Sequence, residues 1–166
     1  MTDFNAADSD KDATHVNEDL MNTEYFRFYH DLLNKKRLLD ECDKYQYKLC
    51  FMPHTNIREC MDLLCEDERI VCFDFDKPYR EAFAEANLLI TDYSSTAMDF
   101  AYLYKPVIYT QFDKERFFSG EHTYEKGYFD YERDGFGDVV YDLDTLIDHT
   151  IQAMRDGCSL KKKYMQ

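Results

Sequence analysis

The fold of this chain is decided by the stretch Leu88-Leu-Ile-Thr-Asp-Tyr-Ser-Ser-Thr-Ala-Met-Asp-Phe100. Its apolar start, 88–91, predicts a buried strand, and the polar residues 92–95 predict a tight turn. Apolar residues then recur at helical spacing, and a second apolar strand is expected over 106–110. The stretch therefore predicts a strand, a turn and a helix that lead into a parallel strand.

The turn is a candidate anion site. In a parallel sheet, Ser94 and Ser95 would lie at the carboxyl end of a strand and at the first N–H groups of a helix. Those N–H groups, the positive end of the helix dipole and the two hydroxyls can bind phosphate oxygens. A plain helix cap explains the same residues without a ligand, because serine is a preferred N-cap residue.

Helical and strand patterns alternate along most of the chain. Helices are expected over 23–43, 56–64, 78–86, 97–103 and 144–154, and strands over 47–52, 69–73, 88–91, 106–110 and 139–141. Thr23 or Asn22 would cap the first helix and Asp144 the last. We expect residues 111–138 to form a long aromatic loop. This alternation is typical of the α/β class, with a Rossmann-like parallel sheet and helices on both of its faces.

Two regions differ in composition. Residues 1–21 are polar and acidic, and we expect them to form a disordered tail. Residues 22–166 are expected to form one α/β domain. Ligands of such sheets bind outside the carboxyl ends of the strands. The sequence places His54, the 92–95 turn and the aromatic loop there.

Composition and charge exclude several classes of function. The net charge of −14 argues against nucleic acid as a partner and against strong adsorption to an anionic membrane. No apolar run approaches the roughly 20 residues of a membrane-spanning helix, and the N-terminus does not have the pattern of a signal peptide. The six cysteines show no zinc-ligand spacing and are expected to be reduced. We therefore predict no metal site and no cofactor.

Three strings resemble motifs of the CDP-glycerol glycerophosphotransferase family, which comprises teichoic acid glycerol- and ribitol-phosphate transferases. The first is Thr91-Asp-Tyr-Ser-Ser95, followed by Asp99-Phe100 and Lys105-Pro-Val-Ile108. The second is Lys126-Gly-Tyr-Phe-Asp-Tyr-Glu132, and the third is Gly135-Phe-Gly-Asp-Val-Val140. They occur in the family's order, and the resemblance runs from about residue 48 to about residue 151.

The resemblance implies the fold and the partners. Members of the family are two-domain enzymes of the GT-B type, and the chain is similar to their C-terminal, donor-binding half without its opening strand. It implies that residues 22–166 bind CDP-glycerol or a related CDP-linked donor. A lipid-linked polymer acceptor would be held by an N-terminal domain that this chain lacks. The implied location is cytoplasmic, and peripheral at the inner face of the cell membrane for the full-length enzyme.

The resemblance also implies the reaction and its residues. Glycerol phosphate or ribitol phosphate would pass from the CDP-linked donor to a teichoic acid or related cell-surface polymer. His54, which follows an expected strand and Pro53, would be the catalytic residue. The donor and its phosphates would be bound by Ser94, Ser95, Asp99 and Lys126, with Thr91, Asp92 and His122 as further candidates.

Two other functions stay open. The chain could be the donor-binding domain of another nucleotide-sugar glycosyltransferase, because strand-end serines do not define the donor. It could also be a non-catalytic module that binds a nucleotide or a partner. We expect the isolated chain to be inactive as a transferase. Without the opening strand, the sheet has a free edge. Either the expected 23–43 helix covers this edge or the edge pairs with another chain, so we expect some tendency to self-associate.

Overall fold

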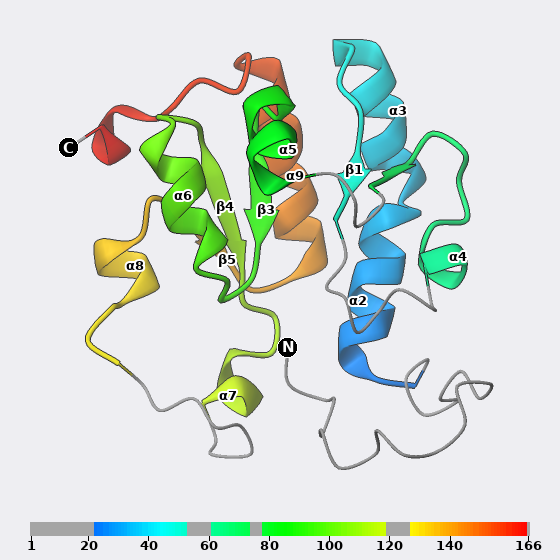
Figure 1. Ribbon diagram of the computed structural model, residues 1–166. Coiled ribbons are helices and arrows are strands. Elements are labelled where there is room, and N and C mark those ends of the chain that lie inside the picture. The colour runs from blue at the N-terminus through cyan, green and yellow to red at the C-terminus, as the bar shows by residue number, and fades with distance from the viewer. Residues whose placement is uncertain (1–21, 53–60, 74–77, 119–126, 166) are drawn as a thin grey trace. The chain divides into compact units, whose positions relative to one another are not determined.

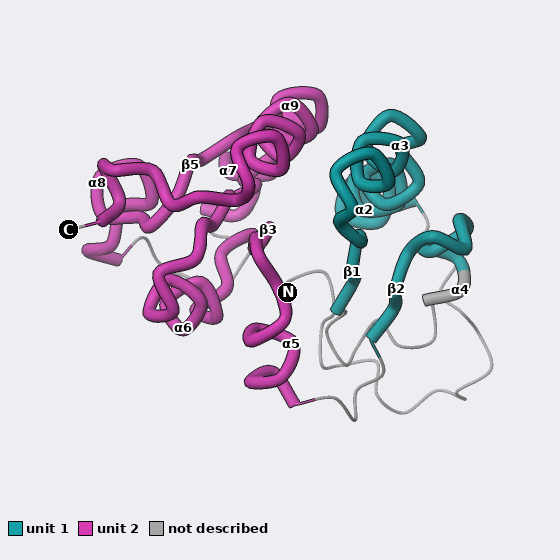
Figure 2. Tube along the Cα trace, turned by 90° about the horizontal axis from the view of Figure 1, so that it is seen from above, with its two compact units in different colours: residues 1–76 teal, residues 77–166 magenta. Residues whose placement is uncertain are grey.

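The computed structural model describes residues 22–52, 61–73, 78–118 and 127–165. The chain forms two compact units, residues 1–76 and residues 77–166, which are drawn in different colours in Figure 2. The expected tail, 1–21, lies outside the described residues, so both its disorder and the expected domain boundary at residue 22 stay predictions.

Unit 1 begins with two helices where the sequence predicted one over 23–43. Helix α2 spans Glu24–Leu33, and the Thr23 hydroxyl caps it by accepting the Phe26 N–H at 3.1 Å, as expected. Helix α3 spans Lys36–Tyr45. The break is at Asn34, whose side chain binds the backbone instead of continuing the helical pattern. An asparagine amide competes with the helix for backbone partners in this way.

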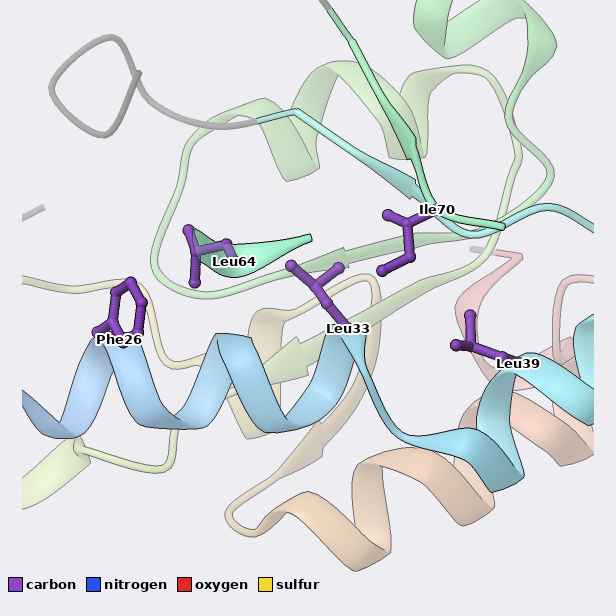
Figure 3. Packing of buried hydrophobic residues seen from close by; sticks show 5 residues of the cluster. All are labelled: Phe26, Leu33, Leu39, Leu64 and Ile70. Atoms are coloured by element: carbon purple, nitrogen blue, oxygen red, sulfur yellow. The ribbon is translucent and has the colours of Figure 1, made fainter. Parts of the chain in front are cut away.

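The rest of unit 1 is a parallel strand pair covered by these helices. Strand β1, Cys50–Phe51, pairs with β2, Val71–Cys72, and a short helix, α4, spans Met61–Leu64. Figure 3 shows the buried side chains that join these elements, namely Phe26, Leu33, Leu39, Leu64 and Ile70. Burial of such side chains contributes about 1.5–3 kcal/mol each, so this cluster holds the helices against the strands.

Unit 2 contains a three-stranded parallel sheet in the order β3-β4-β5 (Figure 1). Strand β3 spans Leu89–Thr91, β4 spans Val107–Thr110 and β5 spans Gly137–Val140. Thr91 is in register with Tyr109, and Thr110 with Val140. The carboxyl ends of all three strands therefore meet at one edge of the sheet.

Helices cover both faces of this sheet, as Figures 1 and 2 show. Helix α5 spans Tyr79–Glu85, α6 spans Thr96–Tyr102 and α9 spans Leu143–Arg155. On the face of α6, Val107 and Tyr109 of β4 pack against Ala97 and Phe100. Alternate residues of β4 point to the other face, where α9 contacts the same strand. The structure thus confirms the expected parallel α/β architecture with two covered faces.

Several predicted boundaries in unit 2 were wrong. Strand β5 begins at Gly137 rather than at residue 139, since Gly137 already pairs with Val107 of β4. The strands approach so closely there that a side chain at residue 137 would collide with the Val107 carbonyl. Helix α9 is capped by Asp142, not Asp144, since the Asp142 carboxylate accepts the Thr145 N–H at 2.8 Å. The expected loop 111–138 contains two short helices, α7 at Lys114–Phe117 and α8 at Tyr131–Asp134.

On α5 the Tyr79 side chain is exposed, with an exposed fraction of 53%, whereas Ala82 is buried. Phe83 of the same helix does pack edge-on against Phe100 of α6, at 5.3 Å between ring centres. The chain ends in a short 3₁₀ helix, η3, over Lys162–Tyr164. Within the described ranges no helix combines the length and the apolar character needed to cross a membrane.

Candidate functional site

The candidate site is built on the turn between β3 and α6. Ser94 caps the turn: its hydroxyl oxygen accepts the Thr96 N–H at 3.3 Å and lies 2.9 Å from the Thr96 hydroxyl. Ser95 occupies the N-cap position of α6, but its backbone is helical and its side chain makes no capping bond. The exposed Ser95 hydroxyl is therefore the group of this turn that is best placed to meet a ligand.

The first amides of α6 are used inside the turn. The Ala97 N–H donates to the Ser94 carbonyl at 3.3 Å, and the Met98 N–H donates to the Ser95 carbonyl at 3.0 Å. These i to i+3 bonds are of the 3₁₀ type that often tightens a helix end. The structure thus shows the helix cap, and these amides are occupied within the turn, whereas the anion site stays a prediction that depends on the Ser95 hydroxyl and the helix dipole.

Asp92 and Thr91 support the turn from the strand side. Burial raises the pKa of the Asp92 carboxyl, whereas hydrogen bonds from the backbone N–H groups of Tyr93 and Ser94 act in the opposite direction. A carboxylate bound to the amides that follow it is the arrangement of an Asx turn. Thr91 is the last residue of β3 and is held in register with Tyr109. Both residues are half-buried, and their contacts with a donor stay predictions.

Asp99 lies four residues after Ser95, one turn further along α6, and its side chain is exposed. Residues at this spacing share one face of a helix. The structure thus brings Asp99 and Ser95 to the same face, as the sequence predicted. Three other predicted residues, His54, His122 and Lys126, lie outside the described residues, and their roles stay predictions.

Tyr93 is the residue of this site that the sequence did not single out. Its hydroxyl donates to the Asp113 carboxylate at 3.0 Å, and its ring stacks on Phe117 with centres 3.6 Å apart and planes 10° apart. Its backbone carbonyl accepts the Tyr131 hydroxyl at 3.0 Å. Burial, followed by the charge and hydrogen bond of Asp113, raises the pKa of the Tyr93 hydroxyl far above its ordinary value. The sequence feature that could have indicated this role is the group of aromatic residues in 111–138, two of which, Phe117 and Tyr131, contact Tyr93.

Two buried polar groups lie at the carboxyl end of β4. The Thr110 hydroxyl and the Gln111 side-chain nitrogen have no hydrogen-bond partner among the described residues. The Gln111 backbone N–H, in contrast, donates to the Val140 carbonyl at 2.8 Å and extends the β4–β5 ladder. A buried polar group without a partner costs about 1–3 kcal/mol. The end of β4, next to Asp113, is therefore a place where a polar partner would stabilise the protein.

Residues 12–166 match the family model described as CDP-Glycerol:Poly(glycerophosphate) glycerophosphotransferase. The chain belongs to this family. It is 34% identical over 157 residues to the Minor teichoic acid biosynthesis protein GgaB of Bacillus subtilis (strain 168), a match that covers 95% of this chain and 17% of GgaB. The chain therefore spans only about a sixth of that relative.

A solved structure gives the same fold. The chain is similar to the wall teichoic acid polymerase TagF with a TM-score of 0.57 and 22% identity, over 79% of this chain and 34% of TagF. At this identity the likeness concerns the fold. It confirms the expected fold class.

Lys105, which belongs to the first of the three family-like strings, has a structural role. Its ammonium group donates to the carbonyls of Phe83, Ala84 and Ala86 at 2.7–2.8 Å. These carbonyls end α5, where a positive charge also meets the negative end of the helix dipole. Lys105 therefore holds α5 in place and is not a ligand-binding residue in this arrangement.

Asp130 and Glu132 of the family's second string are likewise explained by local structure. The Asp130 carboxylate caps α8 by accepting the N–H groups of Glu132 and Arg133, each at 3.0 Å. Glu132 accepts a hydrogen bond from the Tyr141 hydroxyl. Among the described residues no group of three or more acidic, histidine or cysteine side chains could hold a metal ion. The absence of a metal site stays a prediction for the whole chain.

Proposed function

We propose that this chain supplies the donor-binding half of an enzyme that transfers glycerol phosphate, or ribitol phosphate, from a CDP-linked donor to a teichoic acid or related cell-surface polymer. Family membership supports the reaction class. The observation that carries the proposal is the hydrogen-bonded Asp92–Ser95 turn at the carboxyl end of β3, which presents the Ser95 hydroxyl at the start of α6. Ligands of parallel α/β sheets bind at that edge.

In this proposal Ser94 and Ser95 bind phosphate oxygens of the donor, and Asp99 binds a hydroxyl of its glycerol or ribitol. Lys126 would add a positive charge.

The chemistry assigned to His54 is general base catalysis. A hydroxyl oxygen of the acceptor attacks the β-phosphorus of the donor and forms the new P–O bond, while the bond from that phosphorus to the bridging oxygen breaks and CMP leaves. The hydroxyl proton passes to the imidazole of His54, whose ordinary pKa of about 6.5 suits this role. Such transfers depend mainly on positioning and on stabilisation of charge.

The proposed partners are CDP-glycerol or a related donor and a lipid-linked polymer held by a domain outside this chain. We place the complete enzyme at the cytoplasmic face of the membrane as a peripheral protein. The acceptor domain would have to supply the membrane contact, because a net charge of −14 opposes adsorption of this chain to an anionic bilayer.

Calorimetric titration tests the donor assignment. The chain is titrated with CDP-glycerol, CMP, UDP and UDP-glucose, and we expect the cytidine compounds to bind more tightly. Ser94→Ala combined with Ser95→Ala should weaken CDP-glycerol binding by about 1–3 kcal/mol, the usual loss for hydrogen bonds to a charged group. Ser159→Ala, at an exposed serine near the C-terminus, is the control.

Two results would contradict the proposal. Undiminished binding of CDP-glycerol by the double variant would remove the two serines from the site. Tighter binding of UDP-glucose than of CDP-glycerol would favour a different nucleotide-sugar transferase.

A further inference from the structure

Tyr93 contacts two other segments of unit 2, α7 with its N-cap residue and α8. Its hydroxyl reaches Asp113, the residue that precedes α7, its ring lies on Phe117 within α7, and its carbonyl is bound by Tyr131 of α8. Asp113 makes no capping bond to α7, so its carboxylate serves Tyr93. Tyr93 is thus held through its hydroxyl, its ring and its backbone carbonyl.

We propose that Tyr93 is the positioning residue of the donor site, and that it acts by holding Ser94 and Ser95 where they meet the donor. This inference rests on the proposed function and adds a residue to it. Ser94 and Ser95 directly follow Tyr93, so a rotation of Tyr93 would carry both hydroxyls with it. A displacement of about 1 Å in such a site costs a large share of its activity.

The burial of this contact strengthens the inference. Phe117 is buried, and Tyr93 also meets Phe118 and Tyr131 edge-on, at 5.7 and 5.8 Å between ring centres. Aromatic rings keep preferred geometries of this kind because their faces and edges carry opposite partial charge. A ring held on several sides has little freedom, and the turn that contains it is rigid before any donor arrives.

The first test needs no ligand. Tyr93→Phe removes the hydroxyl bond to Asp113 but keeps the ring on Phe117. Amide hydrogen exchange, followed residue by residue by NMR, should become about fivefold faster for the Thr96 N–H, which donates to Ser94, and stay unchanged in α9. Tyr131→Phe, which frees the Tyr93 carbonyl, should have the same effect. Unchanged exchange at Thr96 in both variants would overturn the proposal.

The second test measures binding of CDP-glycerol by calorimetry. Tyr93→Phe should weaken it about fivefold, and Asp113→Ala should do the same. Asp113→Asn should restore binding, because its amide oxygen can still accept the hydroxyl. The matched control is Tyr164→Phe, which breaks another hydrogen bond from a tyrosine to an aspartate of unit 2, at 2.9 Å to Asp138, and should leave binding as it is.

A variant set separates positioning from a general loss of structure. In the background of Ser94→Ala with Ser95→Ala, Tyr93→Phe should have no further effect, because it acts through those serines. Equal weakening by Tyr164→Phe, or a full further loss in the double-serine background, would overturn the proposal. If the parent chain binds none of the nucleotides, the proposed function fails and the donor role of Tyr93 fails with it. The exchange experiment then still decides whether Tyr93 holds the turn.

Discussion

The Tyr164 hydroxyl near the C-terminus donates a hydrogen bond to the Asp138 carboxylate on β5, at 2.9 Å. Lys161 and Lys163 pair with the same carboxylate, and His149 of α9 lies 3.1 Å from it. This interaction ties the end of the chain to the outer strand of the three-stranded sheet. Two lysines of the basic run 161–163 are thus paired within the protein.

We predict that Asp138 makes the stability of the chain depend on acid pH. Burial by itself would raise the pKa of Asp138, but hydrogen bonds from Lys161, Lys163 and Tyr164 hold it well below the ordinary value. A lowered pKa means that the stabilisation is present above the unfolded pKa of about 4 and is lost as the pH falls toward the folded value. Urea unfolding at a series of pH values from 6 downward measures this loss.

The matching variant is Asp138→Asn. It should lower the free energy of unfolding by about 1–3 kcal/mol at neutral pH, because the largely buried carboxylate loses the charge that binds Tyr164 and two exposed lysines. It should also flatten the dependence of stability on acid pH. Glu68→Gln, at an exposed position, is the control. A variant as stable as this control at pH 7 would contradict the role given to Asp138.

Asn34 is predicted to be the most sensitive polar residue of unit 1. Its amide nitrogen donates to the carbonyls of His30 and Leu64 at 2.9 and 2.8 Å, and its oxygen accepts the Glu66 N–H at 2.9 Å. Asn34→Ala removes all of these bonds and should cost about 2–4 kcal/mol of unfolding free energy. Chemical denaturation measures this loss, with Lys36→Ala, at an exposed position two residues away, as the control. Equal stability of the two variants would show that α2 ends for another reason.

Lys105→Met tests the support of α5. Methionine keeps much of the apolar stem but loses three charge-assisted hydrogen bonds to the end of the helix, so we expect a loss of about 1.5–3 kcal/mol. Amide exchange should rise in α5 more than in α9. Lys162→Met, at an exposed lysine, is the comparison. Exchange that is unchanged in α5 would contradict the assignment.

His54→Ala should reduce turnover far more than donor affinity. In a polypeptide long enough to transfer glycerol phosphate, loss of a general base lowers the rate about 10²–10⁴-fold. The donor dissociation constant should stay nearly unchanged, since His54 is assigned to the acceptor proton. His122→Ala is the comparison, because His122 is the weaker candidate. Normal turnover of the His54 variant would remove it from the mechanism.

Local patterns in the sequence predicted the parts of the fold that depend on neighbouring residues. The apolar run before Asp92 and the helical spacing after Ser95 are local, and β3 and α6 were found there. The break at Asn34 depends on Leu64 and Glu66, which are distant along the chain. A helical pattern that runs across residue 34 contains no sign of these partners.

The difference between local patterns and distant contacts also explains which residues of the candidate site were predicted. The serines were predicted because a strand, a turn and a helix bring them to the carboxyl edge of the sheet, and Asp99 was implied by the family resemblance. The role of Tyr93 depends on Asp113 and Tyr131, which follow it by 20 and 38 residues. Strand β5 was shortened in the prediction because Gly137 is a residue type depleted in strands, and only the close approach of β4 explains its presence there.

The most direct test of the central claim is to map the donor onto the chain by NMR. The chain, labelled with ¹⁵N, is titrated with CDP-glycerol, and the shifts of its amide resonances are followed. The account predicts that the largest changes gather between Thr91 and Asp99, with little change in α9. No change at saturating donor, or changes confined to residues outside the turn, would contradict the claim that this turn binds the donor.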